Sequence, residues 1–217
     1  MNIIPLSRLD MYEFWCDPKL IDEVNNELLN PSIDWEPIKN NPTGLSIGYS
    51  DVPYYHYKLF DWFQECLNIV SNLHYNNTPL VIVDSWVTKS EFGKNATAHR
   101  HVASVVSGLL YLSTFKNSGT IFKYADPWHD HIYNLIEQSD KTIKITPEKG
   151  KLILWRSDIM HSAQVHSDIK SIRNSLAFNT FFDGTLSNLP TAKLSLKVES
   201  VKDKYETYIN KKNNETM

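Results

Sequence analysis

The sequence predicts a mainly β protein, a sandwich or barrel, with helices placed before the strands. From residue 79 onward, short runs rich in Val, Ile, Leu, Thr, Tyr and Phe are separated by turn-forming residues, which is typical of strands. These runs do not alternate with helical patterns, which argues against a parallel sheet. The helical signals all lie nearer the N-terminus.

Two helices are expected in the first third of the chain. The stronger one lies within Pro53–Tyr75, and a shorter one runs from about Pro18 to Leu29, entered through the Asp17-Pro18 pair. The stronger segment carries apolar residues at steps of one, three and four, as on one face of a helix. These residues are Leu59, Phe60, Phe63, Leu67, Val70 and Leu73.

Seven strands are expected after the helices, with a tight turn at Pro147–Gly150. They cover residues 80–88, 105–114, 119–124, 142–146, 151–155, 160–166 and 173–182. The tail from Ala192 to Met217 is rich in Lys, Glu and Asn, which favours a peripheral helix or partial disorder.

Length and composition indicate one domain spanning residues 1–217. The 217 residues include 41% hydrophobic and 22% charged residues, which is ordinary for a globular domain with its own core. We divide it into an N-terminal helical region (1–79), a strand-rich core (80–185) and a polar C-terminal tail (186–217). The oligomeric state stays open, with a homodimer among the options.

Charge and cysteine content favour a cytoplasmic protein that binds neither nucleic acid nor membranes. The formal net charge of −3 gives no general attraction to nucleic acid or anionic lipid. Residues 1–15 include Asp10 and Glu13 and resemble neither a signal peptide nor a membrane span. The two cysteines, Cys16 and Cys66, are too few for a secreted disulfide framework.

Three histidines form a candidate metal site. His99 and His101 are two residues apart, so on an extended segment their side chains point to the same face. His161, at the start of a later strand, could supply a third ligand. Imidazole suits iron, zinc, copper and nickel, and an open three-ligand face is typical of iron oxygenases. A His-x-His pair alone is more often incidental.

A candidate anion site lies twelve residues after His161. Arg173 begins another expected strand, and Ser175 lies two residues further on the same face. A guanidinium beside a hydroxyl inside a barrel is costly unless a carboxylate occupies the site. The alternative is that Arg173 forms a salt bridge at the surface or at a strand edge.

Five motifs follow one another between about residues 80 and 182. They are Ser85-Trp86, AHRHVASVVSGLLYL, GTIFKYADP, EKGKLILWRSDIMH and SIRNSLAFN. Together they resemble the iron(II)- and 2-oxoglutarate-dependent oxygenases, most strongly a bacterial and phage group with a His-x-His…Ser-Gly-x-x-Tyr pattern. The resemblance implies a double-stranded β-helix, a cupin-like jelly roll with the N-terminal helices packed on one sheet, in a bacterial cell or a phage-infected host.

The resemblance also implies roles for individual residues. Iron would bind His99, His101 and His161. The distal carboxylate of 2-oxoglutarate would meet Arg173, helped by Ser175 and Tyr111, with Gly108 allowing close packing beneath the tyrosine. The candidates for contact with substrate are Trp86, Trp155 and Asn179.

The sequence departs from the wider superfamily at one ligand. His101 stands where most members have Asp or Glu, so a water molecule or Asp126 could complete the coordination instead. Arg156 and the loop Trp128–His131 are either substrate-facing or simply surface.

The function implied is an Fe(II)- and 2-oxoglutarate-dependent dioxygenase that uses O2, hydroxylates a small-molecule or peptidyl substrate, and releases succinate and CO2. One alternative is a cupin-like three-His dioxygenase or hydrolase that does not use 2-oxoglutarate. The other is a non-catalytic jelly-roll binding module. Arg173 discriminates against the first alternative, because those reactions need no clamp for a dicarboxylate.

Overall fold

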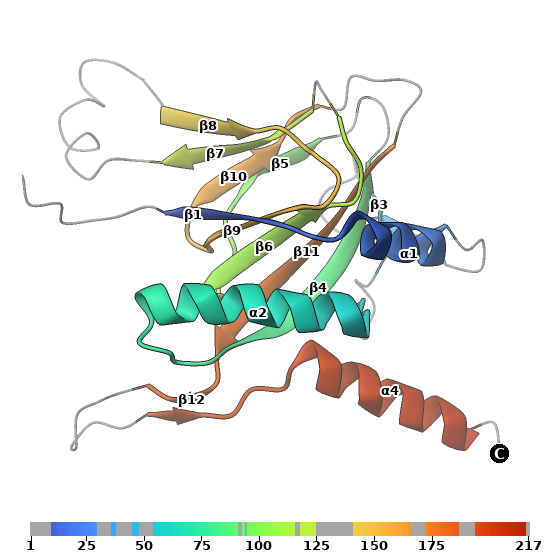
Figure 1. The fold of residues 1–217 in the computed structure, drawn as a ribbon, viewed down its shortest axis with the longest axis vertical. Helices are drawn as coiled ribbons and strands as arrows, with labels where there is room; N and C mark the ends of the chain where they lie inside the picture. The colour runs from blue at the N-terminus through green and yellow to red at the C-terminus, as the bar shows by residue number, and fades with distance from the viewer. Residues whose placement is uncertain are drawn as a thin grey trace, which may run out of the picture.

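A computed structural model of the chain describes residues 10–29, 36–37, 45–47, 54–90, 93, 95–115, 118–124, 141–165, 172–186 and 194–215. Its core is a pair of antiparallel sheets, with helices on the outer side of the larger one (Figure 1). The larger sheet has the strand order β1-β9-β6-β11-β4-β3-β2, and the smaller has the order β5-β10-β7-β8. The prediction of a mainly β fold with flanking helices is confirmed.

The strands have the following bounds. The large sheet contains β1 (Met11–Trp15), β2 (Glu36–Pro37), β3 (Leu45–Ile47), β4 (Leu80–Ser90), β6 (Val106–Tyr111), β9 (Lys151–Arg156) and β11 (Arg173–Phe182). The small sheet contains β5 (Ala96–His99), β7 (Thr120–Tyr124), β8 (Lys141–Ile145) and β10 (Met160–Ala163). A separate hairpin pairs β12 (Gly184–Thr185) with β13 (Ser195–Leu196).

All seven expected strands are present, with ends shifted by a few residues. The structure adds β5, which ends at His99, the first histidine of the pair. It also adds β1, which pairs along the edge of β9 from Met11 opposite Trp155 to Trp15 opposite Lys151. The region expected to be helical thus contributes an edge strand to the large sheet. In β1, half-buried residues on both faces blur the alternation that identifies a strand.

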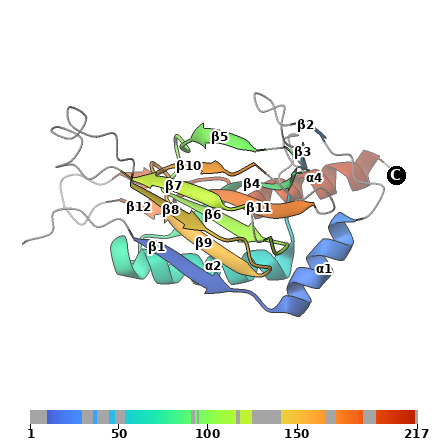
Figure 2. The same cartoon turned by 90° about the horizontal axis from the view of Figure 1, so that it is seen from above.

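The two predicted helices are α1 (Pro18–Leu28) and α2 (Tyr57–His74), and a third, α4 (Val201–Glu215), forms in the polar tail. Figure 2 shows α2 on one side of the large sheet and β5 and β10 on the other. Most of the expected apolar face of α2 is buried, but Leu73, in its last turn, is 59% exposed. Leu73 therefore lies outside the buried part of this helix face. No described helix is long and apolar enough to cross a membrane.

Strand β11 lies between the helix layer and the space that separates the two sheets. Its residue Phe178 is fully buried and packs on Phe63 of α2, with ring centroids 4.6 Å apart. The alternate residues Arg173, Ser175 and Asn179 line the cavity on the other face. This is the period-two alternation of a strand covered on both sides. The same alternation applies to the neighbouring strand β6.

Gly108 of β6 plays a different structural role from the one expected. It lies opposite Phe178 in the pairing with β11, and a Cβ atom on Gly108 would overlap the ring of Phe178. The placement beneath Tyr111 was therefore wrong, since positions 108 and 111 point to opposite faces of the strand. The glycine lets the buried phenylalanine lie flat against the sheet beneath α2.

We predict that Gly108→Ala lowers the free energy of unfolding by about 1–3 kcal/mol, the usual cost of overpacking a core. Urea denaturation measures this loss. Adding Phe178→Leu removes the overlap, so the double variant should lose less stability than the two single changes combined. Simple additivity, or an unchanged stability of Gly108→Ala, would contradict this account of the core.

Candidate metal centre and anion pocket

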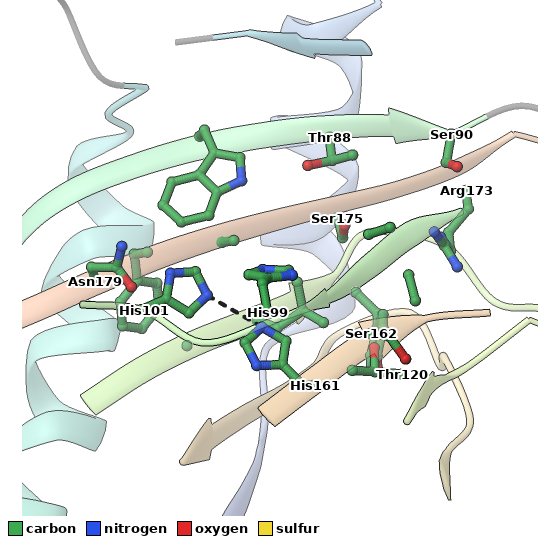
Figure 3. A pocket seen from close by; sticks show the side chains of 18 of the residues that line it. Thr88, Ser90, His99, His101, Thr120, His161, Ser162, Arg173, Ser175 and Asn179 are labelled. Atoms are coloured by element: carbon green, nitrogen blue, oxygen red, sulfur yellow. Dashed lines mark hydrogen bonds between the residues drawn. The ribbon is translucent and has the colours of Figure 1, made fainter. Parts of the chain in front are cut away.

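A cavity of about 340 Å³ lies between the two sheets. Strands β4, β6 and β11 of the large sheet line one side, and the β5 segment and β10 line the other. Figure 3 shows the three histidines grouped together, with Arg173 at one end of the cavity and Asn179 at the other.

The structure brings His99, His101 and His161 together. His99 ends β5 and lies opposite His161 of β10, while His101 follows two residues after His99. One nitrogen from each ring lies within 4.8 Å of the others. The Nε2 atoms of His101 and His161 are 3.2 Å apart, as the dashed line in Figure 3 marks.

Backbone carbonyls orient two of the rings. The Nδ1 atom of His161 lies 3.0 Å from the Ile159 carbonyl oxygen, and Nδ1 of His99 lies 2.8 Å from that of Thr97. Because a carbonyl can only accept a hydrogen bond, each Nδ1 carries the proton and each Nε2 keeps its lone pair. Such a second hydrogen bond is typical of metal-binding histidines.

Burial keeps His101 and His161 neutral, which is the form that binds metals. It lowers the pKa of His101 to about 3, helped by the neighbouring His161 and His99. It also lowers the pKa of His161 to about 4, with a smaller contribution from His99. Both rings are therefore unprotonated near pH 7 and can offer lone pairs to a cation.

The three imidazoles fit a transition metal. Two nitrogen ligands that are each about 2.1 Å from one ion lie roughly 3 Å apart, close to the separation of the His101 and His161 Nε2 atoms. Within the described ranges, the group that could hold a metal contains these three histidines and no carboxylate. Asp126, the alternative ligand, lies outside the described residues.

Arg173 is buried at the end of the cavity shown at the right of Figure 3. Its side chain is 6% exposed, and its NH1 group donates hydrogen bonds to Ser118 Oγ at 2.6 Å and to the Gln164 carbonyl oxygen at 3.2 Å. No carboxylate in the described part of the chain forms an ion pair with it, and burial lowers its pKa. A buried guanidinium without an anionic partner is a costly arrangement that a bound anion would relieve.

Hydroxyl groups surround Arg173. Ser175 lies opposite Tyr111 on β6 and opposite Thr88 on β4, so these side chains share the cavity face. The Tyr111 hydroxyl donates a 2.7 Å hydrogen bond to Thr120 Oγ1, and burial raises its pKa to about 12. The structure thus places Arg173, Ser175 and Tyr111 in one polar pocket whose phenol stays protonated.

The candidate substrate-facing residues also line the cavity. The Trp86 ring centroid lies 5.8 Å from that of His101, and the Trp155 centroid lies 5.0 Å from that of His161. Trp155 Nε1 is buried and has no hydrogen-bond partner in the described structure. Asn179 Oδ1 accepts a 2.9 Å hydrogen bond from Ser107 Oγ, so its amide has a structural contact beside the histidines.

Several cavity residues were missed by sequence reasoning, and one candidate lies outside the cavity. Arg156 forms an ion pair with Asp158 and is about half exposed, so it belongs to the surface. The loop at residues 128–131 lies outside the described residues. The missed cavity residues, which lack a motif of their own and depend on strand pairing, are Asp84, Thr88, Ser90 and Thr120. Ser118 was also missed, and it accepts a hydrogen bond from Arg173.

Comparison with known proteins agrees with this geometry. Residues 84–179 match the family described as "Putative 2OG-Fe(II) oxygenase". The resemblance to the 2OG-Fe(II) oxygenases is confirmed. A search of curated proteins finds no match to the sequence.

Solved structures of 2OG oxygenases share the fold. The epimerase SnoN from nogalamycin biosynthesis superposes with a TM-score of 0.57 at 12% identity, covering 88% of this chain and 89% of SnoN. A Pseudomonas putida prolyl-4-hydroxylase superposes with a TM-score of 0.56 at 10% identity, covering 80% of this chain and 92% of the hydroxylase. A viral collagen prolyl hydroxylase from Paramecium Bursaria Chlorella virus-1 superposes with a TM-score of 0.54 at 12% identity, covering 78% of this chain and 94% of the viral enzyme. The two sheets therefore form the double-stranded β-helix of these oxygenases.

We predict that His161→Ala abolishes stoichiometric Fe(II) binding, because removing one of three ligands leaves a weak two-point site. Anaerobic equilibrium dialysis with metal analysis measures the loss, and circular dichroism checks that the fold survives. His74→Ala is the matched control, since His74 lies on α2 and contacts Tyr12 outside the cluster. Retention of one tightly bound iron by His161→Ala would show that the cluster is not the metal site.

Proposed function

We propose that the protein is an Fe(II)- and 2-oxoglutarate-dependent dioxygenase that hydroxylates a small-molecule or peptidyl substrate. The observation that supports this most strongly is the sharing of one cavity by a three-histidine cluster and a buried arginine without a carboxylate partner. A metal site alone is compatible with many activities. A metal site beside an anion receptor of this kind suits a co-substrate that is both a chelator and a dicarboxylate.

Each group then has a defined task. His99, His101 and His161 would hold the iron, each through one ring nitrogen. Arg173 would bind the distal carboxylate of 2-oxoglutarate through parallel N–H bonds, and the protonated Tyr111 hydroxyl would donate to it in place of Thr120 Oγ1. Fe(II), when bound, would supply the reaction with O2 that decarboxylates 2-oxoglutarate to succinate and CO2 and hydroxylates the substrate.

Neighbouring residues cover His161 and fix the position of His101. Phe122 and Trp155 are almost fully buried and pack against the His161 ring, with centroid distances of 5.8 and 5.0 Å. The His101 backbone N–H donates to the Ser157 carbonyl oxygen at 3.0 Å, which fixes the segment that carries this ligand. Excluding water from such a site limits side reactions while the co-substrate is oxidised.

A second candidate function follows from the ligand set itself. Three histidines without a carboxylate in the described ranges also suit a cupin-like dioxygenase that does not use 2-oxoglutarate. That reaction gives no role to the buried charge of Arg173. The arginine therefore favours the 2-oxoglutarate-dependent reaction over the alternative.

We predict that protein loaded with Fe(II) converts 2-oxoglutarate to succinate in air, slowly even without substrate. Succinate is quantified by mass spectrometry against a metal-free control. If no succinate appears while Fe(II) is shown to be bound, the cupin-like alternative becomes the better account.

We predict that Arg173→Leu raises the 2-oxoglutarate concentration needed for half-maximal turnover about 100- to 1,000-fold, with iron affinity almost unchanged. Arg173→Lys should need a 2-oxoglutarate concentration between those of the wild type and Arg173→Leu, because lysine keeps the charge but loses the paired hydrogen bonds. The control is Arg156→Leu, which removes a surface arginine already paired with Asp158. An unchanged 2-oxoglutarate requirement in Arg173→Leu would remove the main support for the proposed co-substrate.

A further inference from the structure

The cavity carries opposite charges at its two ends. Arg173 lies opposite Ser90 at the end of β4, whereas Asp84 is six residues earlier on the same strand, opposite Asn179. At about 3.3 Å per residue, the two charged positions are roughly 20 Å apart along the sheet. Among the described residues that line the cavity, Asp84 is the one acidic side chain. The end away from the arginine is therefore negative.

The Asp84 carboxylate is accessible from solvent and forms no ion pair with a described lysine or arginine. The ammonium group of Lys204, from α4, lies nearby, but it donates its hydrogen bond to the Val83 carbonyl oxygen at 2.7 Å. Partial burial raises the pKa of Asp84, while the charge of Lys204 opposes that rise. A second cation at the carboxylate would stabilise its charged form.

An indole and an amide accompany this carboxylate. Trp86 is two residues after Asp84 on the same face of β4, and its ring centroid lies 5.8 Å from that of His101. Opposite Trp86 on β11 stands the small residue Ala177, which also lines the cavity. A carboxylate next to an aromatic face is a combination that binds ammonium groups, through charge and through the electron-rich ring.

We propose that the substrate carries a positively charged amine, which Asp84 and Trp86 bind at the end of the cavity opposite Arg173, so that a carbon near the amine faces the metal site. This inference rests on the proposed function and adds the chemical class of the substrate. The negatively charged dicarboxylate would bind the Arg173 guanidinium, and the positively charged ammonium group would bind the Asp84 carboxylate. An anionic substrate would be repelled by Asp84, and a neutral one would leave the carboxylate without a partner.

The test compares two probes of equal length, hexylamine and 1-hexanol, by isothermal calorimetry on the anaerobic protein loaded with Fe(II) and 2-oxoglutarate. We expect the wild-type protein to bind the amine about tenfold more tightly than the alcohol, the usual effect of a hydrogen bond to a charged group. Asp84→Asn should abolish this preference. Repeating the titrations on metal-free protein excludes direct ligation of the metal by the amine.

The control variant Asp61→Asn removes the same charge from an exposed position on α2 and should keep the preference for the amine. The inference is overturned if the wild-type protein binds hexylamine no better than 1-hexanol, if neither probe binds, or if the preference survives in Asp84→Asn. Titration with 2-oxoglutarate alone separates the two proposals. Normal 2-oxoglutarate binding without an amine preference refutes only the substrate class, whereas absent 2-oxoglutarate binding refutes the proposed function.

Discussion

The burial of one positive charge, that of Arg173, is the constraint on which the arrangement of the cavity depends. The guanidinium lies between two sheets with hydroxyl and carbonyl oxygens around it and no carboxylate among the described residues. Neutral acceptors offset only part of the cost of removing a cation from water. The fold tolerates this cost because the rest of the core is large and apolar. A bound dicarboxylate would supply the negative charge that pairs with the guanidinium.

The two sheets supply different residues of the site. The large sheet is stabilised from behind by α2, where Phe63 packs on Phe178, so its cavity face can carry polar residues without weakening the core. The small sheet supplies His99 and His161 as directly opposed residues of β5 and β10. His99 and His161 of the small sheet and Arg173 of the large sheet thereby line one cavity.

Much of this architecture could be predicted from the sequence, because local patterns determine it. The alternating strand 173–182 and the apolar face of α2 are visible in the printed residues. What the sequence could not show was pairing between distant strands. Thr120 beside Tyr111 and Asp84 opposite Asn179 depend on that register. Gly108 was assigned to the wrong face for the same reason, since its partner is Phe178 on another strand. The ligand roles of the histidines and Arg173 stay predictions.

The central claim is that the three histidines and Arg173 serve a single site for Fe(II) and 2-oxoglutarate together. Anaerobic absorption spectroscopy tests it most directly, because chelation of Fe(II) by 2-oxoglutarate produces a metal-to-ligand charge-transfer band. The account predicts a visible band that appears only when both are added and saturates at one equivalent of each. If both bind to the protein and no band develops, they occupy separate sites and the account is contradicted.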